Sequence, residues 1–303
     1  MTTGAVLAVD GVSKSFGDVT AVDDLTFHAD PGSVTGFLGP NGAGKTTTLR
    51  MLAGLVRPNA GRATVGGVTY DGLTDPMRAV GCVLDDTGFV GGRTARNHLR
   101  VVATAAGIGR ARVDEVIDLV GLSDAADRKA RGFSLGMRQR LHLATALLAD
   151  PRALVLDEPG NGLDPEGIAW LRTLLRWLAD DGRTVLVSSH LLGEIAQVAD
   201  HVVVLNRGRL VTAAPLDELL ARQERTVVVG SARSDDLAVA LGVTGPQIRR
   251  IDATTLEVEG VTAAQVGEVA LRAGVAVHEL RDVQPDLEQV FLSLITNDER
   301  PVP

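Results

Sequence analysis

The fold is decided by the stretch Gly39-Pro40-Asn41-Gly42-Ala43-Gly44-Lys45-Thr46, which Thr47 follows. It fulfils the pattern G-x-x-x-x-G-K-T of a phosphate-binding loop. An apolar run at 34–38 precedes the loop and predicts a strand, and residues 48–53 can continue the chain as a helix. A strand before the loop and a helix after it is the setting in which this pattern holds a polyphosphate. A glycine-rich turn without a ligand is the alternative.

The residue types of this loop suit a bound nucleotide. Glycine reaches backbone conformations that bring bare amides close to phosphate oxygens, and the partial positive charge at a helix start attracts an anion. Lys45 would reach the β and γ phosphates, and the hydroxyl of Thr46 would ligate Mg²⁺. We therefore expect residues 39–47 to form the phosphate part of a nucleotide site.

A pair of acids ends a predicted buried strand. Residues 153–156 are apolar, and Asp157 and Glu158 follow them directly. Ligands of open α/β sheets bind at the carboxyl ends of the strands. Beside a phosphate loop, Asp157 would hold Mg²⁺ and Glu158 would act as the general base toward an attacking water. The alternative is a solvated acidic turn.

Two further polar residues follow predicted strands at 80–84 and 184–189. Asp85 ends the first, where ligands bind in such sheets, although an ordinary polar turn has the same sequence. His190 follows the second, where it would hydrogen-bond a γ-phosphate or orient the water. A lone histidine in this position is more often structural, so neither residue decides the function by itself.

Ser134 and Phe16 give weaker binding signals. Ser134 is placed to cap a helix that begins in the segment 133–140, and a helix start beside a glycine is an anion site. Many helices begin with serine and bind no ligand. Phe16, expected in a loop between two strands, offers a flat face for a purine base, or else belongs to the core.

Composition limits the class of protein. The 303 residues are 45% hydrophobic and 22% charged, which fits one large globular domain and a small one. The net charge of -8 argues against a nucleic-acid-binding surface. Cys82 is the only cysteine, so no intrachain disulfide can form. We expect no signal peptide and no membrane span, since no apolar run approaches the roughly 20 residues that a spanning helix needs.

Periodicity predicts the remaining elements. Residues 95 to about 150 form a helical block, and the strand at 202–205 is expected to be the last of its domain. Between 225 and 296 the order is β-α-β-β-α-β, which suits a small ferredoxin-like domain. Its strands are expected at 227–229, 248–251, 255–258 and 275–280, and its helices at 235–241 and 263–273.

Taken in order, these motifs resemble the nucleotide-binding domain of the ATP-binding-cassette (ABC) family over about residues 7–220. The resemblance implies an α/β P-loop NTPase core with an antiparallel β subdomain and a helical subdomain at about 90–150. A small α+β domain, accessory or regulatory, would occupy residues 221–303.

The same resemblance gives roles to the weaker positions. Phe16 falls at the adenine-stacking aromatic, Asp85 at the Q-loop position and His190 at the switch histidine. Segment 160–164 falls at the D-loop, and segment 133–137 at the signature usually written LSGGQ. Within that signature, the residues implied to bind nucleotide are Ser134, Gly136 and Met137.

Two departures from the family pattern are present. Asp85 replaces the usual glutamine, which makes this metal contact shorter and charged, so we expect altered coupling or rate. Leu135 and Met137 replace glycine and glutamine in the signature, while Ser134 and Gly136 are kept. This S-x-G-M form resembles the branch that serves drug, antibiotic and peptide exporters with a separate permease chain.

The resemblance implies an ATPase that uses ATP and Mg²⁺ and works as a head-to-tail homodimer. Its partner would be a transmembrane permease, and it would lie at the cytoplasmic face of the cell membrane. We expect it to bind no nucleic acid. A soluble cassette protein acting on ribosomes or DNA is the alternative, although such relatives usually carry two cassettes or basic linkers. A nucleotide-sensing module without turnover is a third hypothesis, against which Glu158 and His190 argue.

Overall fold

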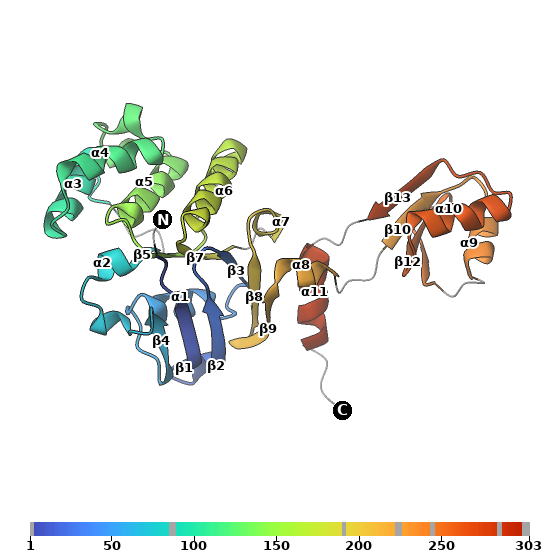
Figure 1. Cartoon of the computed structure of the whole chain (residues 1–303), viewed down its shortest axis with the longest axis horizontal. Helices are drawn as coiled ribbons and strands as arrows, with labels where there is room; N and C mark the ends of the chain where they lie inside the picture. Colours follow the sequence, from blue (N-terminus) through green and yellow to red (C-terminus); the bar gives the residue numbers. More distant parts are fainter. Residues whose placement is uncertain are drawn as a thin grey trace. The chain divides into compact units, whose positions relative to one another are not determined.

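The computed structural model describes residues 3–84, 89–189, 192–221, 226–242, 246–283 and 287–298. The chain divides into two compact units. The first comprises Met1–Leu216 with Ile295–Pro303, and the second comprises Asp217–Leu294. The first unit contains two sheets and the second contains one, and each has its own helices (Figure 1).

A six-stranded sheet forms the centre of the first unit, in the order β5-β6-β7-β3-β8-β9. The first five of these strands run parallel to one another, and β9 pairs antiparallel with β8. Strands β3, β6 and β7 are buried along their whole length, which explains why they read as continuous apolar runs. The bounds are β3 Val34–Leu38, β5 Val80–Val83, β6 Ala153–Leu156, β7 Thr184–Ser188, β8 His201–Asn206 and β9 Arg209–Pro215.

Strand β9 corrects the expectation that residues 202–205 end the sheet. Arg207 and Gly208 both have positive φ, 48° and 81°, and form the two-residue turn of a hairpin that returns antiparallel to β8. Residues of β9 are exposed or half-buried, because this strand lies at the sheet edge. Its sequence therefore lacks the apolar run that marks the central strands.

A second, antiparallel sheet has the order β2-β1-β4. Its strands are β1 Leu7–Phe16, β2 Val19–Ala29 and β4 Ala60–Val65. Buried residues alternate along β1, and its inner face shares one hydrophobic core with helix α1 (Lys45–Leu52) and the six-stranded sheet. Phe27 of β2 stacks on Phe37 of β3 with ring centroids 5.0 Å apart. The core thus fixes α1, and with it the phosphate loop, between the two sheets.

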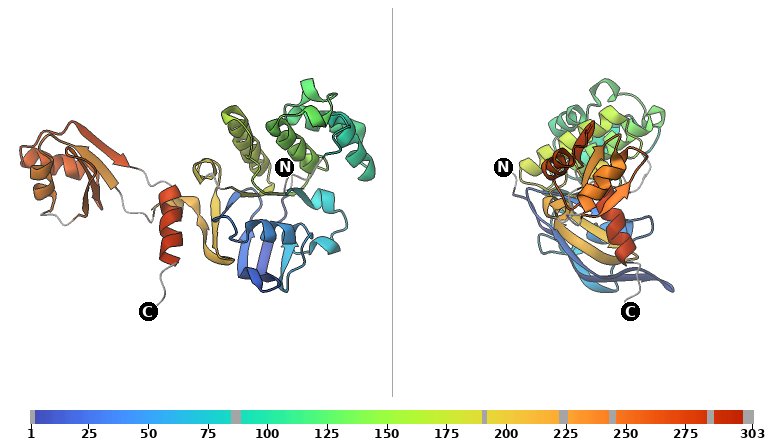
Figure 2. Two further views of the ribbon diagram at one scale, coloured as in Figure 1. Left: turned by 180° about the vertical axis from the view of Figure 1, so that it is seen from behind. Right: turned by 90° about the vertical axis from the view of Figure 1, so that its right-hand side faces the viewer.

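The helical block is a group of helices within the first unit. It consists of α3 (Ala95–Ala105), α4 (Arg110–Leu119) and α5 (Leu135–Leu147), which pack on one another. Figures 1 and 2 show this group beside α6 (Pro165–Asp180), which packs on β7 and β3. The short helices are α2 Pro76–Ala79 and α7 Leu192–Ile195, and the 3₁₀ turns are Tyr70–Gly72, Ser123–Ala125 and Ala130–Gly132.

The second unit contains a four-stranded antiparallel sheet with the order β11-β12-β10-β13. Helices α9 and α10 pack on it through one core that includes Val227, Leu237, Leu256 and Val266. The elements of this unit are β10 Thr226–Gly230, α9 Ser234–Gly242, β11 Ile248–Arg250, β12 Thr255–Glu259, α10 Ala263–Arg272 and β13 Glu279–Val283. Helices α8 (Leu216–Ala221) and α11 (Leu287–Asp298) also belong to it, except for Leu216 and residues 295–298, which fall in the first unit.

The strand expected at 275–280 lies at 279–283 instead. Val275 is buried in this core and Val277 packs against it, so the two alternate as they would in a strand. Segment 275–278 nevertheless forms no strand, and the ladder with β10 begins at Glu279.

Among the described residues, no helix has both the length and the apolar character needed to span a bilayer.

Asp200 joins three elements of the first unit. Its carboxylate accepts a hydrogen bond from the backbone N–H of Val34 at 2.8 Å, and both of its oxygens lie 2.9 Å from Nη1 of Arg176 on α6. Asp200 precedes β8, so this one side chain links β8 to the start of β3 and to the helix that covers them. Arg176 also pairs with the exposed Asp180 one turn along its own helix.

We expect Asp200→Ala to lower the free energy of unfolding by about 1–3 kcal/mol, because the partly buried N–H of Val34 loses its acceptor. The matched control is Asp180→Ala, which removes only an exposed i,i+4 pair and should change stability by no more than about 0.5 kcal/mol. Urea unfolding followed by circular dichroism measures both. Equal effects of the two substitutions would contradict this account.

Candidate functional site

The phosphate loop runs from the end of β3 to the start of α1 and leaves no room for side chains at two of its glycines. Gly44 has φ 103°, and a Cβ there would lie 2.5 Å from the carbonyl oxygen of Ala21 on β2. A Cβ at Gly39 would lie 2.6 Å from the carbonyl oxygen of Leu205 on β8. The loop is therefore held closely against the two neighbouring strands, which fixes the direction of its amides.

Lys45 is buried within this loop. Its Nζ donates to the carbonyl oxygens of Gly39 at 2.6 Å and Pro40 at 3.2 Å. Burial lowers the pKa of Lys45, and the carboxylates of Glu158 and Asp157 partly oppose that shift. A polyphosphate on the loop would add an anionic partner to the two carbonyl oxygens that Lys45 already contacts, and would favour the charged ammonium.

Asp157 lies directly after β6 and is bound at both carboxylate oxygens. The hydroxyl of Thr46 donates to Oδ2 at 2.8 Å, and the hydroxyl of Ser188 donates to Oδ1 at 2.5 Å. A hydroxyl and a carboxylate oxygen side by side are the hard oxygen donors that Mg²⁺ takes, and this metal completes its shell with waters and phosphate oxygens. The donor set of Thr46 and Asp157 therefore fits Mg²⁺.

Glu158 follows in an unusual backbone conformation. Its φ is 49°, in the left-handed region that residues with side chains seldom adopt, and its N–H donates to the hydroxyl of Ser188 at 2.9 Å. Glu158 lines a cavity of about 370 Å³ together with Thr46 and Asp157. The cavity is completed by Val83, Leu135, Gln139 and Asn161. A base on the wall of the cavity that also holds the metal ligands can act on a water bound there.

The signature segment starts α5, as the sequence predicts. Ser134 caps this helix, since its Oγ accepts the N–H of Met137 at 3.2 Å, and Ser134 itself is exposed. Leu135 packs directly over Gly162, so the signature rests on the D-loop segment of its own chain. Leu135 lines the cavity described above, whereas Ser134, Gly136 and Met137 do not.

Phe16, expected in a loop, is instead the last residue of β1, where it pairs with Val19 of β2, and the residue is 52% exposed. This exposure argues against Phe16 as a core residue and leaves one face of its ring available for stacking on a purine base. Lys14 Nζ lies 5.1 Å from the centroid of the ring. Asp85 and His190, the other two predicted site residues, lie outside the described residues.

Sequence reasoning missed Ser188 and Leu135 as site residues. Ser188 belongs to a strand-like run, and nothing in its own sequence pattern distinguishes it from a core serine. The signal that could have found it is its place at the carboxyl end of a strand, two residues before His190. Leu135 is a departure from the family signature, so the resemblance gave it no role.

The phosphate loop, the acidic strand end and the parallel sheet that joins them define a P-loop nucleotide-binding protein. A family model described as ABC transporter matches residues 22–161. A second model, described as a domain of unknown function, matches residues 225–288.

Curated relatives match much or nearly all of the chain. The bacitracin transport ATP-binding protein BcrA of Bacillus licheniformis is 40% identical over 223 residues, 73% of each chain. The daunorubicin resistance ATP-binding protein DrrA3 of Streptomyces coeruleorubidus is 36% identical over 312 residues, 97% of each chain. A solved ATP-binding subunit of an ABC transporter aligns with TM-score 0.66 and 27% identity, over 72% of this chain and 92% of that one. The chain therefore belongs to the ATP-binding subunits of the ABC transporter family, which hydrolyse ATP.

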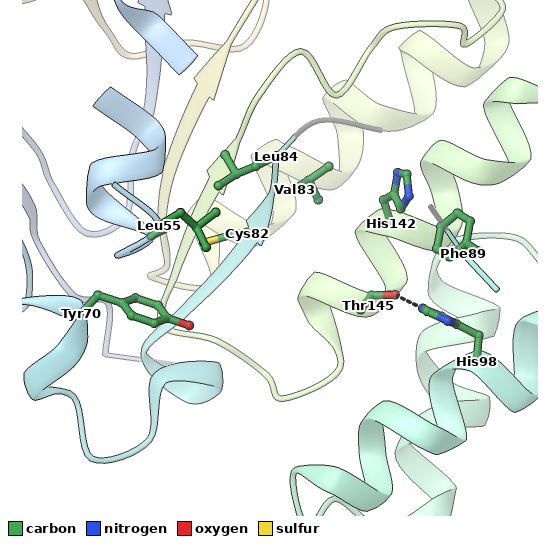
Figure 3. A pocket seen from close by; sticks show the side chains of 10 residues that line it. Leu55, Tyr70, Cys82, Val83, Leu84, Phe89, His98, His142 and Thr145 are labelled. Atoms are coloured by element: carbon green, nitrogen blue, oxygen red, sulfur yellow. Dashed lines mark hydrogen bonds between the residues drawn. The ribbon is translucent and has the colours of Figure 1, made fainter. Parts of the chain in front are cut away.

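A second cavity, of about 390 Å³, lies between β5 and the helical block (Figure 3). Figure 3 shows His98 and His142 entering it from α3 and α5, with Nε2 of His98 3.3 Å from the hydroxyl of Thr145. Phe89 stacks on His142 and meets His98 edge-on, with centroid distances of 4.2 and 4.9 Å. Cys82 lies on the β5 wall, and burial raises the pKa of its thiol to about 12.

We expect Cys82 to react with iodoacetamide more than about 10³-fold more slowly at pH 8 in the folded protein than in guanidinium, where an ordinary thiol pKa of about 8.5 applies. Because the thiolate is the nucleophile, the rate in the folded protein should rise about tenfold per pH unit between pH 8 and 10 without levelling off. Intact-mass spectrometry follows the reaction at this one cysteine. Similar folded and unfolded rates would show that the thiol is not held neutral.

Proposed function

We propose that this chain is the ATP-hydrolysing subunit of an exporter, and that it couples ATP-driven dimerisation to export of a drug, antibiotic or peptide through a separate permease chain. The observation that carries this proposal is the site in which Thr46, Asp157 and Glu158 line one cavity beside the phosphate loop. Two relatives named for bacitracin transport and daunorubicin resistance support the export branch. The S-x-G-M signature supports the same branch.

Each residue of the site has a part in the proposed reaction. Amides of the loop and the ammonium of Lys45 bind the polyphosphate, and the exposed ring of Phe16 stacks on the adenine. Thr46 and Asp157 would hold Mg²⁺, which neutralises charge on the phosphate oxygens when it is bound. Asp85 would add a metal contact. Glu158 accepts a proton from the attacking water, and His190 orients that water.

The switch is association of two copies of the chain. Ser134 lies at the start of α5 and is exposed to solvent, and its hydroxyl accepts the backbone N–H of Met137. Opposed to the loop of a second copy, this helix start would cover the γ-phosphate, with Gly136 allowing close approach. ATP then bridges two helix starts, and hydrolysis removes the bridge. In this proposal the chain sits at the cytoplasmic face of the membrane, held there by the permease.

We assign the ATPase to a domain of residues 1–220 and an accessory role to residues 221–303. Among the residues of the second unit that the structure describes, none repeats the site chemistry of the first unit, and the place of this unit after the ATP-binding domain is the reason to propose a regulatory or dimer-supporting role. The soluble alternative, a cassette acting on ribosomes or DNA, is disfavoured by the net charge of -8.

Glu158→Gln tests the proposed switch. Loss of the general base should lower ATP hydrolysis by about 10²–10⁴-fold while ATP binding remains, so the variant should form a stable dimer in Mg-ATP. Analytical ultracentrifugation with and without Mg-ATP measures the dimer. Glu166→Gln, an exposed acid in the first turn of α6, is the control and should behave as wild type. A Glu158→Gln chain that stays monomeric at saturating Mg-ATP would contradict the proposal.

A further inference from the structure

Ser188 is a fully buried residue at the end of β7, between the two halves of the site. In the sheet order, β7 separates β6 from β3. The parallel register pairs Leu156 with Val187 and Phe37 with Ser188, so all three strands end at one level. Ser188 therefore lies next to Asp157 on one side and to the start of the phosphate loop on the other.

The hydroxyl of Ser188 both donates and accepts a hydrogen bond. It donates its single proton to Oδ1 of Asp157 at 2.5 Å and accepts the N–H of Glu158 at 2.9 Å. These two bonds use the proton and a lone pair, so they fix the rotation of the hydroxyl. One side chain thus holds two consecutive residues of the site.

The hydrogen bond from Ser188 to Oδ1 of Asp157 determines the direction of the other carboxylate oxygen, Oδ2. The χ2 torsion of aspartate has a broad, roughly two-fold distribution, so the side chain alone does not fix the carboxylate plane. With Oδ1 bound to Ser188, Oδ2 is the oxygen that faces the hydroxyl of Thr46, at 2.8 Å. The carboxylate is thereby oriented before any metal arrives.

The bond to Glu158 holds a strained backbone. Glu158 has φ 49°, and a non-glycine residue stays in this region only where its surroundings fix it. The N–H that Ser188 accepts belongs to the same residue, so this bond helps to set the direction in which the side chain of Glu158 leaves the strand end.

We propose that Ser188 is the positioning residue of this site: its hydroxyl holds the carboxylate of Asp157 for the metal and the backbone of Glu158 for the attacking water. The inference rests on the proposed Mg²⁺ site of Thr46 and Asp157. Residues that orient metal ligands typically change metal affinity or activity by about 10–100-fold when they are removed.

The test compares Ser188→Ala with Thr184→Val in the full chain. Thr184 is equally buried on the same strand, but its hydroxyl donates to the carbonyl of Ala5, at 2.8 Å and away from the site. The first readout is the affinity for Mn²⁺ in the presence of a non-hydrolysable ATP analogue, measured by electron paramagnetic resonance. The second is the affinity for the same analogue in EDTA. The third is kcat for ATP as a function of Mg²⁺ concentration.

Ser188→Ala should weaken Mn²⁺ binding and lower kcat, each by about 10–100-fold, while analogue affinity in EDTA changes less than about twofold. Thr184→Val should leave all three readouts as in wild type, even where its melting temperature falls. Ser188→Thr, which keeps the hydroxyl, should bind Mn²⁺ with an affinity close to that of wild type. Ser188→Cys, which replaces the hydroxyl with a somewhat larger thiol that donates only weakly, should behave like Ser188→Ala and provides a second variant if alanine does not fold.

The outcomes separate this inference from the proposed function. A wild-type chain whose nucleotide complex binds no Mn²⁺ would overturn the proposed metal site, and this inference with it. A wild-type chain that binds Mn²⁺, with Ser188→Ala or Ser188→Cys binding it equally well, would overturn the role of Ser188 alone. Equal losses in Ser188→Ala and Thr184→Val would also overturn it, since they would reflect general destabilisation.

Discussion

The contact on which the site depends is the hydrogen bond between Thr46 and Asp157 across the sheet. It joins the first turn of α1 to the end of β6, although the two residues are 111 positions apart in the chain. It forms because the strands are parallel and in register, so that residues after different strands meet at one edge. Strand β7 lies between them and supplies Ser188. The site is therefore a consequence of strand order, and the loop motif alone would not create it.

Burial gives these contacts their strength. Lys45 and Asp157 are both nearly inaccessible to water, and electrostatic interactions are stronger in such surroundings than at the surface. The same burial lowers the pKa of Lys45 and makes the ammonium dependent on anionic or carbonyl partners. The core between the two sheets, with Phe27 stacked on Phe37, holds α1 and the phosphate loop in place.

The sequence alone predicts the elements that carry strong local patterns. The phosphate loop, the apolar strands β3, β6 and β7, and the cap of α5 at Ser134 were predicted because glycine spacing, apolar runs and capping are local. Strand β9 was missed because edge strands are half-exposed, and β13 was displaced because Val275 and Val277 pack in the core without pairing. Ser188 has only a weak local signal, its place at the end of a strand. Its role comes from β7 lying between β6 and β3, which is a property of the topology.

The proposed function requires that this ATPase works with a membrane permease formed by another chain. The most direct measurement is an affinity pull-down of the tagged full chain from its native host in mild detergent, with partners identified by mass spectrometry. We expect a stoichiometric partner that carries several membrane-spanning segments. Recovery of ribosomes or of a soluble complex in its place would contradict the transport function.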